Sequence, residues 1–212
     1  MPRHLLILTG ELEATQLEAA LNPAAGPDCE VTAIASTAEL DAWHNQGLYG
    51  VRLLSFCTRI IVPPGILSSL TLEPYNVHPG SPQYPGVYPE AYATYDEATR
   101  FAATAHVMAE KVDTGAIVKT DWFDVTPGWG REQLAERAYE AALGVLFEIA
   151  LLCMANDTPL PRTDETWCGT WRTRAHYNTM CKSGGTEEET ARRRRAFAPD
   201  FASAPPAASN EL

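Results

Sequence analysis

Two side chains that donate hydrogen bonds stand close together in the run Tyr75-Asn76-Val77-His78, which ends at Pro79-Gly80. If this run is a β-strand, the amide of Asn76 and the imidazole of His78 project from the same face, because side chains alternate along a strand. Such a pair, held rigidly, can stabilise the negative charge that develops on the oxygen of a carbonyl group under attack. The pair therefore indicates acyl transfer.

Asp113 adds a carboxylate in the turn sequence Val-Asp-Thr-Gly. A carboxylate beside His78 would favour the charged imidazolium, which stabilises an oxyanion better than the neutral ring does. It could also accept a proton from an attacking amine, directly or through water. The sequence has no G-x-S-x-G nucleophile turn, so the three residues indicate transfer without a covalent enzyme intermediate. Spacing alone does not show that Asp113 approaches His78.

The apolar pattern predicts an α/β fold with a mostly parallel sheet. Strands expected at 4–8, 30–35 and 51–56 alternate with helices over 11–21 and 36–46, as in right-handed βαβ units. Further strands are expected at 73–78, 102–108 and 116–123, and further helices at 91–98 and 132–154. His78 then lies at the C-terminal end of a strand, next to a Pro- and Gly-rich loop, where sheets of this kind form their sites.

The C-terminal part of the chain has a different composition. Residues 166–171 are aromatic and predict a strand or hairpin, 186–196 predict a charged helix, and the Ala/Pro/Ser-rich residues from 198 onward predict disorder. We expect one α/β domain over 1–155, an extension packed on it over 156–197 and a disordered tail over 198–212. The aromatics Trp167, Trp171 and Tyr177 either pack on the edge of the core or stack on a ligand, and this segment is a candidate for homodimer formation.

The charge excludes one class of partner. The formal net charge is −11, and four of the 16 basic residues form the run Arg192–Arg195. So acidic a chain repels nucleic-acid phosphates, and the basic run is either a solvated helix face or a site for a phosphate or an acidic subunit. The longest apolar run, 141–154, is too short to span a bilayer, and the N-terminus has no signal pattern. We expect a cytoplasmic protein without membrane or nucleic-acid contacts.

The five cysteines are irregularly spaced and include no CxxC pair, so a structural metal site is not expected. The set Cys168, His176 and Cys181 also matches no common metal-ligand spacing. A protein of this length buries enough apolar surface to fold without a metal or disulfide.

The motifs taken together resemble the folate-dependent formyltransferase family, which includes glycinamide ribonucleotide, methionyl-tRNA and sugar N-formyltransferases. Three pieces occur in the family's order, namely Asn76-Val77-His78-Pro79, Thr104-Ala105-His106 and Val112-Asp113-Thr-Gly-Ala-Ile117. The segment Leu53–Pro63 is similar to the family's strand and loop that cradle the pterin ring. The resemblance extends from about residue 51 to 152 and implies a Rossmann-like formyltransferase domain with a small C-terminal extension.

The resemblance also implies roles for individual residues. Asn76 and His78 would polarise a formyl group and hold the oxyanion, while Asp113 would keep His78 charged and relay the proton of the amine. The formyl donor would be the co-substrate N10-formyltetrahydrofolate, and no metal would be needed. Folate contacts would come from Phe56, Arg59, Ile60, Ile61, Thr104, His106 and Asp113.

Departures from the family pattern narrow the range of possible amine acceptors. Many relatives have Ser-Leu-Leu-Pro after the histidine, where this chain has a loop rich in Pro and Gly over 79–86. Gly10-Glu11-Leu12-Glu13 replaces the phosphate loop of the glycinamide ribonucleotide enzymes, and we do not expect the tRNA-binding domain of the methionyl-tRNA enzymes. The implied acceptor is a primary amine on a small molecule, either an amino sugar (nucleotide-linked ones included) or a natural-product amine. Two alternatives stay open: a 10-formyltetrahydrofolate hydrolase and a catalytically silent folate-binding protein.

Overall fold

The computed structural model describes residues 3–182, 185–198 and 200–201. Its centre is a six-stranded sheet in the order β2-β1-β3-β4-β5-β6. Along the sheet these strands are Cys29–Ile34, Arg3–Leu8, Val51–Phe56, Tyr75–His78, Arg100–Val107 and Ile117–Asp124. The first four are parallel, and β5 and β6 are antiparallel to their neighbours. The predicted α/β fold with a mostly parallel sheet is confirmed.

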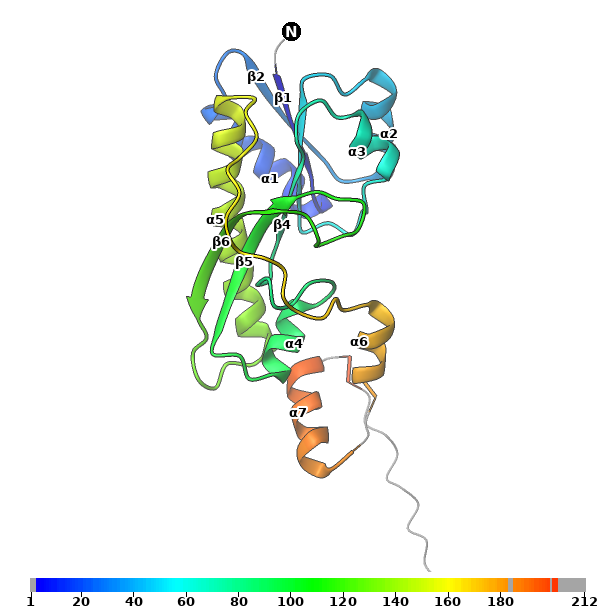
Figure 1. The fold of residues 1–212 in the computed structure, drawn as a ribbon, viewed down its shortest axis with the longest axis vertical. Coiled ribbons are helices and arrows are strands. Elements are labelled where there is room, and N and C mark those ends of the chain that lie inside the picture. Colours follow the sequence, from blue (N-terminus) through cyan, green and yellow to red (C-terminus); the bar gives the residue numbers. More distant parts are fainter. Residues whose placement is uncertain (1–2, 183–184, 199, 202–212) are drawn as a thin grey trace, which may run out of the picture.

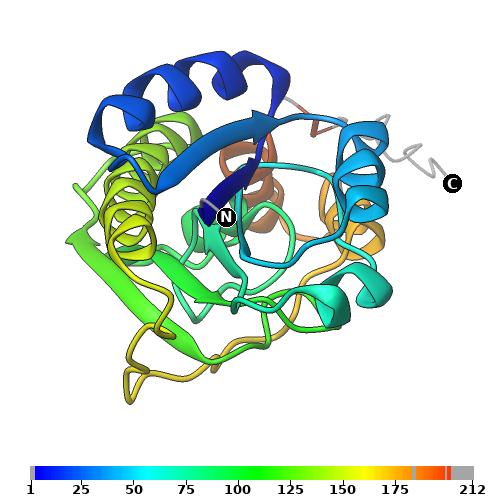
Figure 2. The same ribbon diagram turned by 90° about the horizontal axis from the view of Figure 1, so that it is seen from above.

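Helices cover both faces of the sheet (Figure 2). One face carries α1 (Glu11–Leu21), followed by the short η1 (Asn22–Ala24), and α5 (Arg131–Ala155). The other carries α2 (Thr37–Gln46) and α3 (Pro64–Ser69). Because β1 is covered on both sides, its alternating residues Leu5 and Leu6 enter different cores, which explains its unbroken apolar run.

The long helix α5 packs against the sheet through residues such as Ala142, Leu146 and Ile149. Among the described residues, α5 is the one helix that is long and apolar enough to cross a bilayer. Half of its most apolar stretch is buried inside the protein. Its apolar face is therefore used for the core.

Three helices lie beyond the C-terminal ends of the parallel strands: α4 (Pro89–Tyr95), α6 (Arg174–Met180) and α7 (Glu187–Phe197) (Figure 1). They form a second core with the start of α5, in which Tyr92, Tyr177 and Phe197 are almost fully buried. The basic run of α7 makes ion pairs within and beyond the helix: Arg193 bonds Glu189 of the same helix at 2.7 Å, and Arg195 ties the helix to Glu97, just after α4, at 2.6 Å.

Several boundaries differ from those expected. The helix predicted over 91–98 runs from Pro89 to Tyr95, because proline is favoured in the first turn of a helix. The strand or hairpin expected over 166–171 is instead an extended segment without strand partners of its own, followed by a single bridge between Gly86 and Arg172. Helices α3 and α6 were not predicted. Of the expected tail over 198–212, all but 198, 200 and 201 lies outside the described residues.

Candidate active site

The N-x-H and T-x-H motifs lie side by side in the sheet. β4 and β5 pair in antiparallel register, with Asn76 opposite His106 and His78 opposite Thr104. Asn76 Nδ2 lies 3.0 Å from His106 Nε2, and His106 Nδ1 lies 2.9 Å from the Val107 carbonyl oxygen, to which it donates. His106 therefore orients the Asn76 amide from the neighbouring strand.

Asp113 reaches both histidines from the loop between β5 and β6. Its Oδ2 lies 3.6 Å from His78 Nδ1, and its Oδ1 lies 3.3 Å from His106 Nε2. The Gly86 N–H donates to Oδ2 at 2.8 Å, and the side chain is only 2% exposed. Three segments that are distant in sequence thus meet at one carboxylate.

The surroundings of Asp113 keep it ionised. Burial alone would raise the pKa of this carboxyl, but the imidazoles of His78 and His106 and the Gly86 amide outweigh burial and lower the pKa to about 2. Among the described residues, Oδ1 accepts no hydrogen bond of good geometry. This buried oxygen faces His106 Nε2 at 3.3 Å.

Both ring nitrogens of His78 face protein acceptors. Nε2 donates to the Tyr84 carbonyl oxygen at 3.1 Å, and Nδ1 lies 3.6 Å from Asp113 Oδ2. The Asn76 amide lies beside His106 Nε2 and lines the cleft, where its N–H groups can face a ligand. His78 can offer a hydrogen bond to a ligand only by releasing the Tyr84 carbonyl.

Two glycines in the loop after β4 permit this packing. A Cβ on Gly80 would lie 2.4 Å from His78 Nε2, and one on Gly86 would lie 2.1 Å from the Arg172 carbonyl oxygen. Gly86 also has a φ of 101°, which side chains rarely adopt. The Thr104 hydroxyl fixes the start of the loop by donating to the Gly80 carbonyl at 2.7 Å.

A cleft of about 510 Å³ opens above Asn76, His78 and Asp113. One part of its lining, here called the apolar wall, consists of Ile60, Ile61, Val62, Met108 and Val112. Another part, here called the basic wall, consists of Tyr88, Trp171, Arg172 and Arg174. The cleft therefore brings the three polar residues together with linings of different chemistry.

Most of the residues expected to contact folate line this cleft. Arg59, Ile60, Ile61, His106 and Asp113 do so, and Ile61 is 69% exposed. Two do not. Phe56 is fully buried with its ring 5.5 Å from that of Tyr139, and the buried hydroxyl of Thr104 is engaged by Gly80. The side chains of Phe56 and Thr104 therefore pack within the fold and do not line the cleft.

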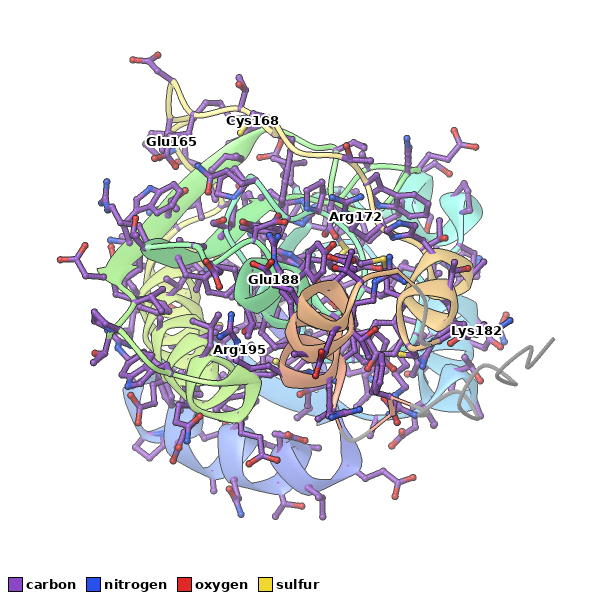
Figure 3. The ribbon with its side chains drawn as sticks, turned by 90° about the horizontal axis from the view of Figure 1, so that it is seen from below. Glu165, Cys168, Arg172, Lys182, Glu188 and Arg195 are labelled. Atoms are coloured by element: carbon purple, nitrogen blue, oxygen red, sulfur yellow. The ribbon has the colours of Figure 1, made fainter. Side chains whose placement is uncertain are left out.

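The C-terminal segment contributes residues that the motifs did not reveal. Figure 3 shows Glu165, Cys168 and Arg172 following one another along this segment before α6. The Trp167 ring lies edge-on to His78 and His106, with centroids 5.8 and 5.1 Å away, and its Nε1 donates to the Gly115 carbonyl at 2.8 Å. Trp167 was noted only as an aromatic that packs or stacks, and no spacing rule connects it to the motifs.

The fold and motifs match a known family. Residues 35–149 match the family model described as "Formyl transferase", a match that covers more than half of the chain. The chain belongs to the formyl transferase family. This confirms the resemblance and the expectation that the protein is an N-formyltransferase at the level of the family. A comparison with the sequences of curated proteins finds no match.

Solved structures of formyltransferases share the fold. A sugar N-formyltransferase from a Shewanella species is 19% identical with a TM-score of 0.70, covering 92% of this chain and 87% of that one. A 4-N formyltransferase from Francisella tularensis is 15% identical with a TM-score of 0.68 and the same coverage. An N-formyltransferase from Helicobacter canadensis, in complex with folinic acid and dTDP-3-aminofucose, is 15% identical with a TM-score of 0.64, covering 93% and 81%.

Proposed function

We propose that this formyl transferase moves a formyl group from N10-formyltetrahydrofolate to the primary amine of a small molecule, an amino sugar in the first instance. The observation that carries the proposal is the convergence of Asn76, His78 and Asp113 at the floor of a cleft. The structurally similar enzyme from Helicobacter canadensis, which was solved with a folate and a nucleotide-linked amino sugar, supports this choice of ligands.

The residues present suit a folate on the apolar wall. Ile60 and the exposed Ile61 offer apolar surface to a flat ring, and the Asp113 carboxylate lines the same cleft. When bound, the co-substrate would supply a formyl group that is already activated for transfer, so the proposed reaction needs no metal.

The polar residues would act mainly by stabilising charge. The Asn76 amide would donate to the formyl oxygen, and a charged His78 would lower the energy of negative charge on that oxygen, directly if Nε2 releases the Tyr84 carbonyl. Because the pKa of Asp113 is lowered to about 2, its carboxylate is a weak base. We assign it chiefly to holding His78 charged, with water carrying the amine's proton away.

The test is a product balance with purified variants. Nucleotide-linked amino sugars and simple amino sugars are supplied with N10-formyltetrahydrofolate, and both formylated amine and free formate are measured. Asp113→Asn and His78→Ala should each lower formylated amine about 10²- to 10³-fold. The control Arg100→Gln, on the exposed start of β5, should transfer normally. Near-native transfer by either variant, if folded, would contradict the proposal.

The same assay decides between the two alternatives. Formate released at full rate without an amine would indicate a hydrolase with the same three residues. Folate binding without turnover of any amine would indicate a silent binding protein, against which the intact set of Asn76, His78 and Asp113 argues.

A further inference from the structure

The indole ring of Trp167 packs against both histidines of the site. Its centre lies 5.8 Å from that of His78 and 5.1 Å from that of His106, and both contacts are edge-on, with interplanar angles of 68° and 85°. The two histidines are only 6% and 2% exposed. Trp167 itself does not belong to the lining of the cleft. We therefore expect it to act on the reaction through the histidines and not through contact with a ligand.

One hydrogen bond ties the same ring to the turn that carries Asp113. Trp167 Nε1 donates to the Gly115 carbonyl at 2.8 Å. The turn has no space to shift, because a Cβ on Gly115 would lie 1.9 Å from the Val107 carbonyl oxygen. Asp113 has a positive φ of 54°, which is uncommon for residues other than glycine. The tryptophan thus helps to hold a carboxylate whose backbone conformation is unfavourable.

The backbone that follows this tryptophan fixes the loop after β4. The Cys168 N–H donates to the Pro82 carbonyl at 3.1 Å. At the next position the two segments are in direct contact, because a Cβ on Gly169 would lie 1.6 Å from the Gln83 carbonyl oxygen. The extension therefore holds the loop by its backbone, and the tryptophan side chain is fixed at the start of this contact.

That loop in turn contacts two of the residues assigned to the reaction. The Tyr84 carbonyl accepts from His78 Nε2, and the Gly86 N–H donates to Asp113 Oδ2. Residues 167–169 consequently contact every group that surrounds the carboxylate: the two imidazoles, the turn that carries it and the loop that donates to it.

We propose that Trp167 is a positioning residue for formyl transfer, holding the imidazoles of His78 and His106 at the Asp113 carboxylate. The ring also keeps water from these buried groups, and interactions between charged and polar groups are stronger where water is excluded. This inference rests on the proposed function. It adds a residue from outside the stretch 35–149 that matches the family.

The main experiment is steady-state kinetics of the full chain with N10-formyltetrahydrofolate and an amino sugar. Trp167→Ala should lower kcat about 10- to 100-fold, because misplacing a reacting group by about 1 Å can cost about 100-fold in rate. Both KM values should stay unchanged. Trp167→Phe keeps a ring against the histidines and loses the bond to Gly115, so its kcat should recover to within about fivefold of the unaltered protein.

Trp122 provides the matched control. Its Nε1 donates to Glu165 at 2.7 Å, so it also links the sheet to the extension, and its ring lies 5.2 Å from the Arg100 guanidinium at the start of β5. Trp122→Ala removes a ring and a hydrogen bond of the same kind and should leave kcat unchanged. Calorimetric titration with folinic acid shows that each variant is folded. An unchanged kcat in Trp167→Ala, or a loss of the same size in Trp122→Ala, would overturn the proposal, as would a rise in KM at constant kcat.

A second readout needs no turnover. Diethyl pyrocarbonate labels accessible imidazoles, and mass spectrometry measures the rate at each histidine, with the exposed His44 on α2 as the internal reference. His78 and His106 should be labelled faster in Trp167→Ala than in Trp122→Ala or the unaltered protein. Faster labelling supports the positioning role even if no amine is formylated, in which case only the proposed function fails. Unchanged labelling overturns the positioning role even if formyl transfer is observed.

Discussion

The two walls of the cleft differ in chemistry and in where they arise along the chain. The apolar wall comes from the segments after β3 and β5, which lie within the residues 35–149 that match the family. Three residues of the basic wall, Trp171, Arg172 and Arg174, come from the C-terminal extension outside that match. From this difference we predict a division of labour, with the apolar wall for the donor and the basic wall for the acceptor.

Gly86 is the point at which the two walls are joined, so altering it should have the largest effect. Its N–H donates to Asp113, and a Cβ there would overlap the Arg172 carbonyl oxygen. We expect Gly86→Ala to lower the free energy of unfolding by about 3 kcal/mol and to weaken binding of both folinic acid and a nucleotide-linked amino sugar. Denaturant titration measures the first effect and calorimetry the second.

Gly47→Ala is the matched control, because Gly47 also has a positive φ, of 94°, but has open space around it. It should cost about 1 kcal/mol and leave both ligands unaffected. Equal effects of the two substitutions would show that Gly86 does not connect the walls.

Asp113 should make the free energy of unfolding depend on pH in the acid range. Its pKa is about 2 in the folded protein and its ordinary value is 3.8, so its stabilising effect is complete above about pH 4 and is lost as the pH falls toward 2. The difference corresponds to about 2 kcal/mol. Denaturation at pH 5 and pH 2.5 should show a smaller acid-dependent loss for Asp113→Asn than for Asp124→Asn, which alters an exposed carboxylate. Identical losses would contradict the ionised state of Asp113.

The smallest predicted effect tests the apolar wall alone. Ile61→Asp places a charge on the exposed apolar surface of that wall and should raise the KM for the folate donor about tenfold, which is about 1.4 kcal/mol. The KM for the acceptor should not change. Leu12→Asp, at an even more exposed apolar residue on α1, should change neither constant. A rise in the acceptor KM would mean that the walls do not divide the ligands as proposed.

The sheet and the motifs were predictable because their signals are local. An unbroken apolar run such as Leu5–Leu8 is what a strand covered on both faces requires. Likewise, the N-x-H pattern places two side chains on one face of a strand. The role of the T-x-H motif became clear only from the register between β4 and β5, which places Asn76 opposite His106.

The path of the C-terminal extension and its residues in the site could not be predicted, because they depend on contacts between distant segments. The backbone of the extension is fixed by bonds from Cys168 to Pro82 and from Arg172 to Pro85, which leave no periodic pattern in the sequence. Trp167 and Trp171 were therefore noted only as aromatics that either pack or stack, and Arg172 and Arg174 were not predicted. The seven-residue helix α6 is likewise too short for a periodic signal and is held by tertiary packing around Tyr177.

The most direct test of the account is a crystal structure of the protein with folinic acid. We predict that the pterin lies against Ile60 and Ile61 and that the folate's one-carbon end points to the Asn76 amide, with the basic wall left open for the acceptor. A folate bound against Trp171 and Arg172, or away from the cleft that His78 and Asp113 line, would contradict the central claim that this cleft is where the formyl group is transferred.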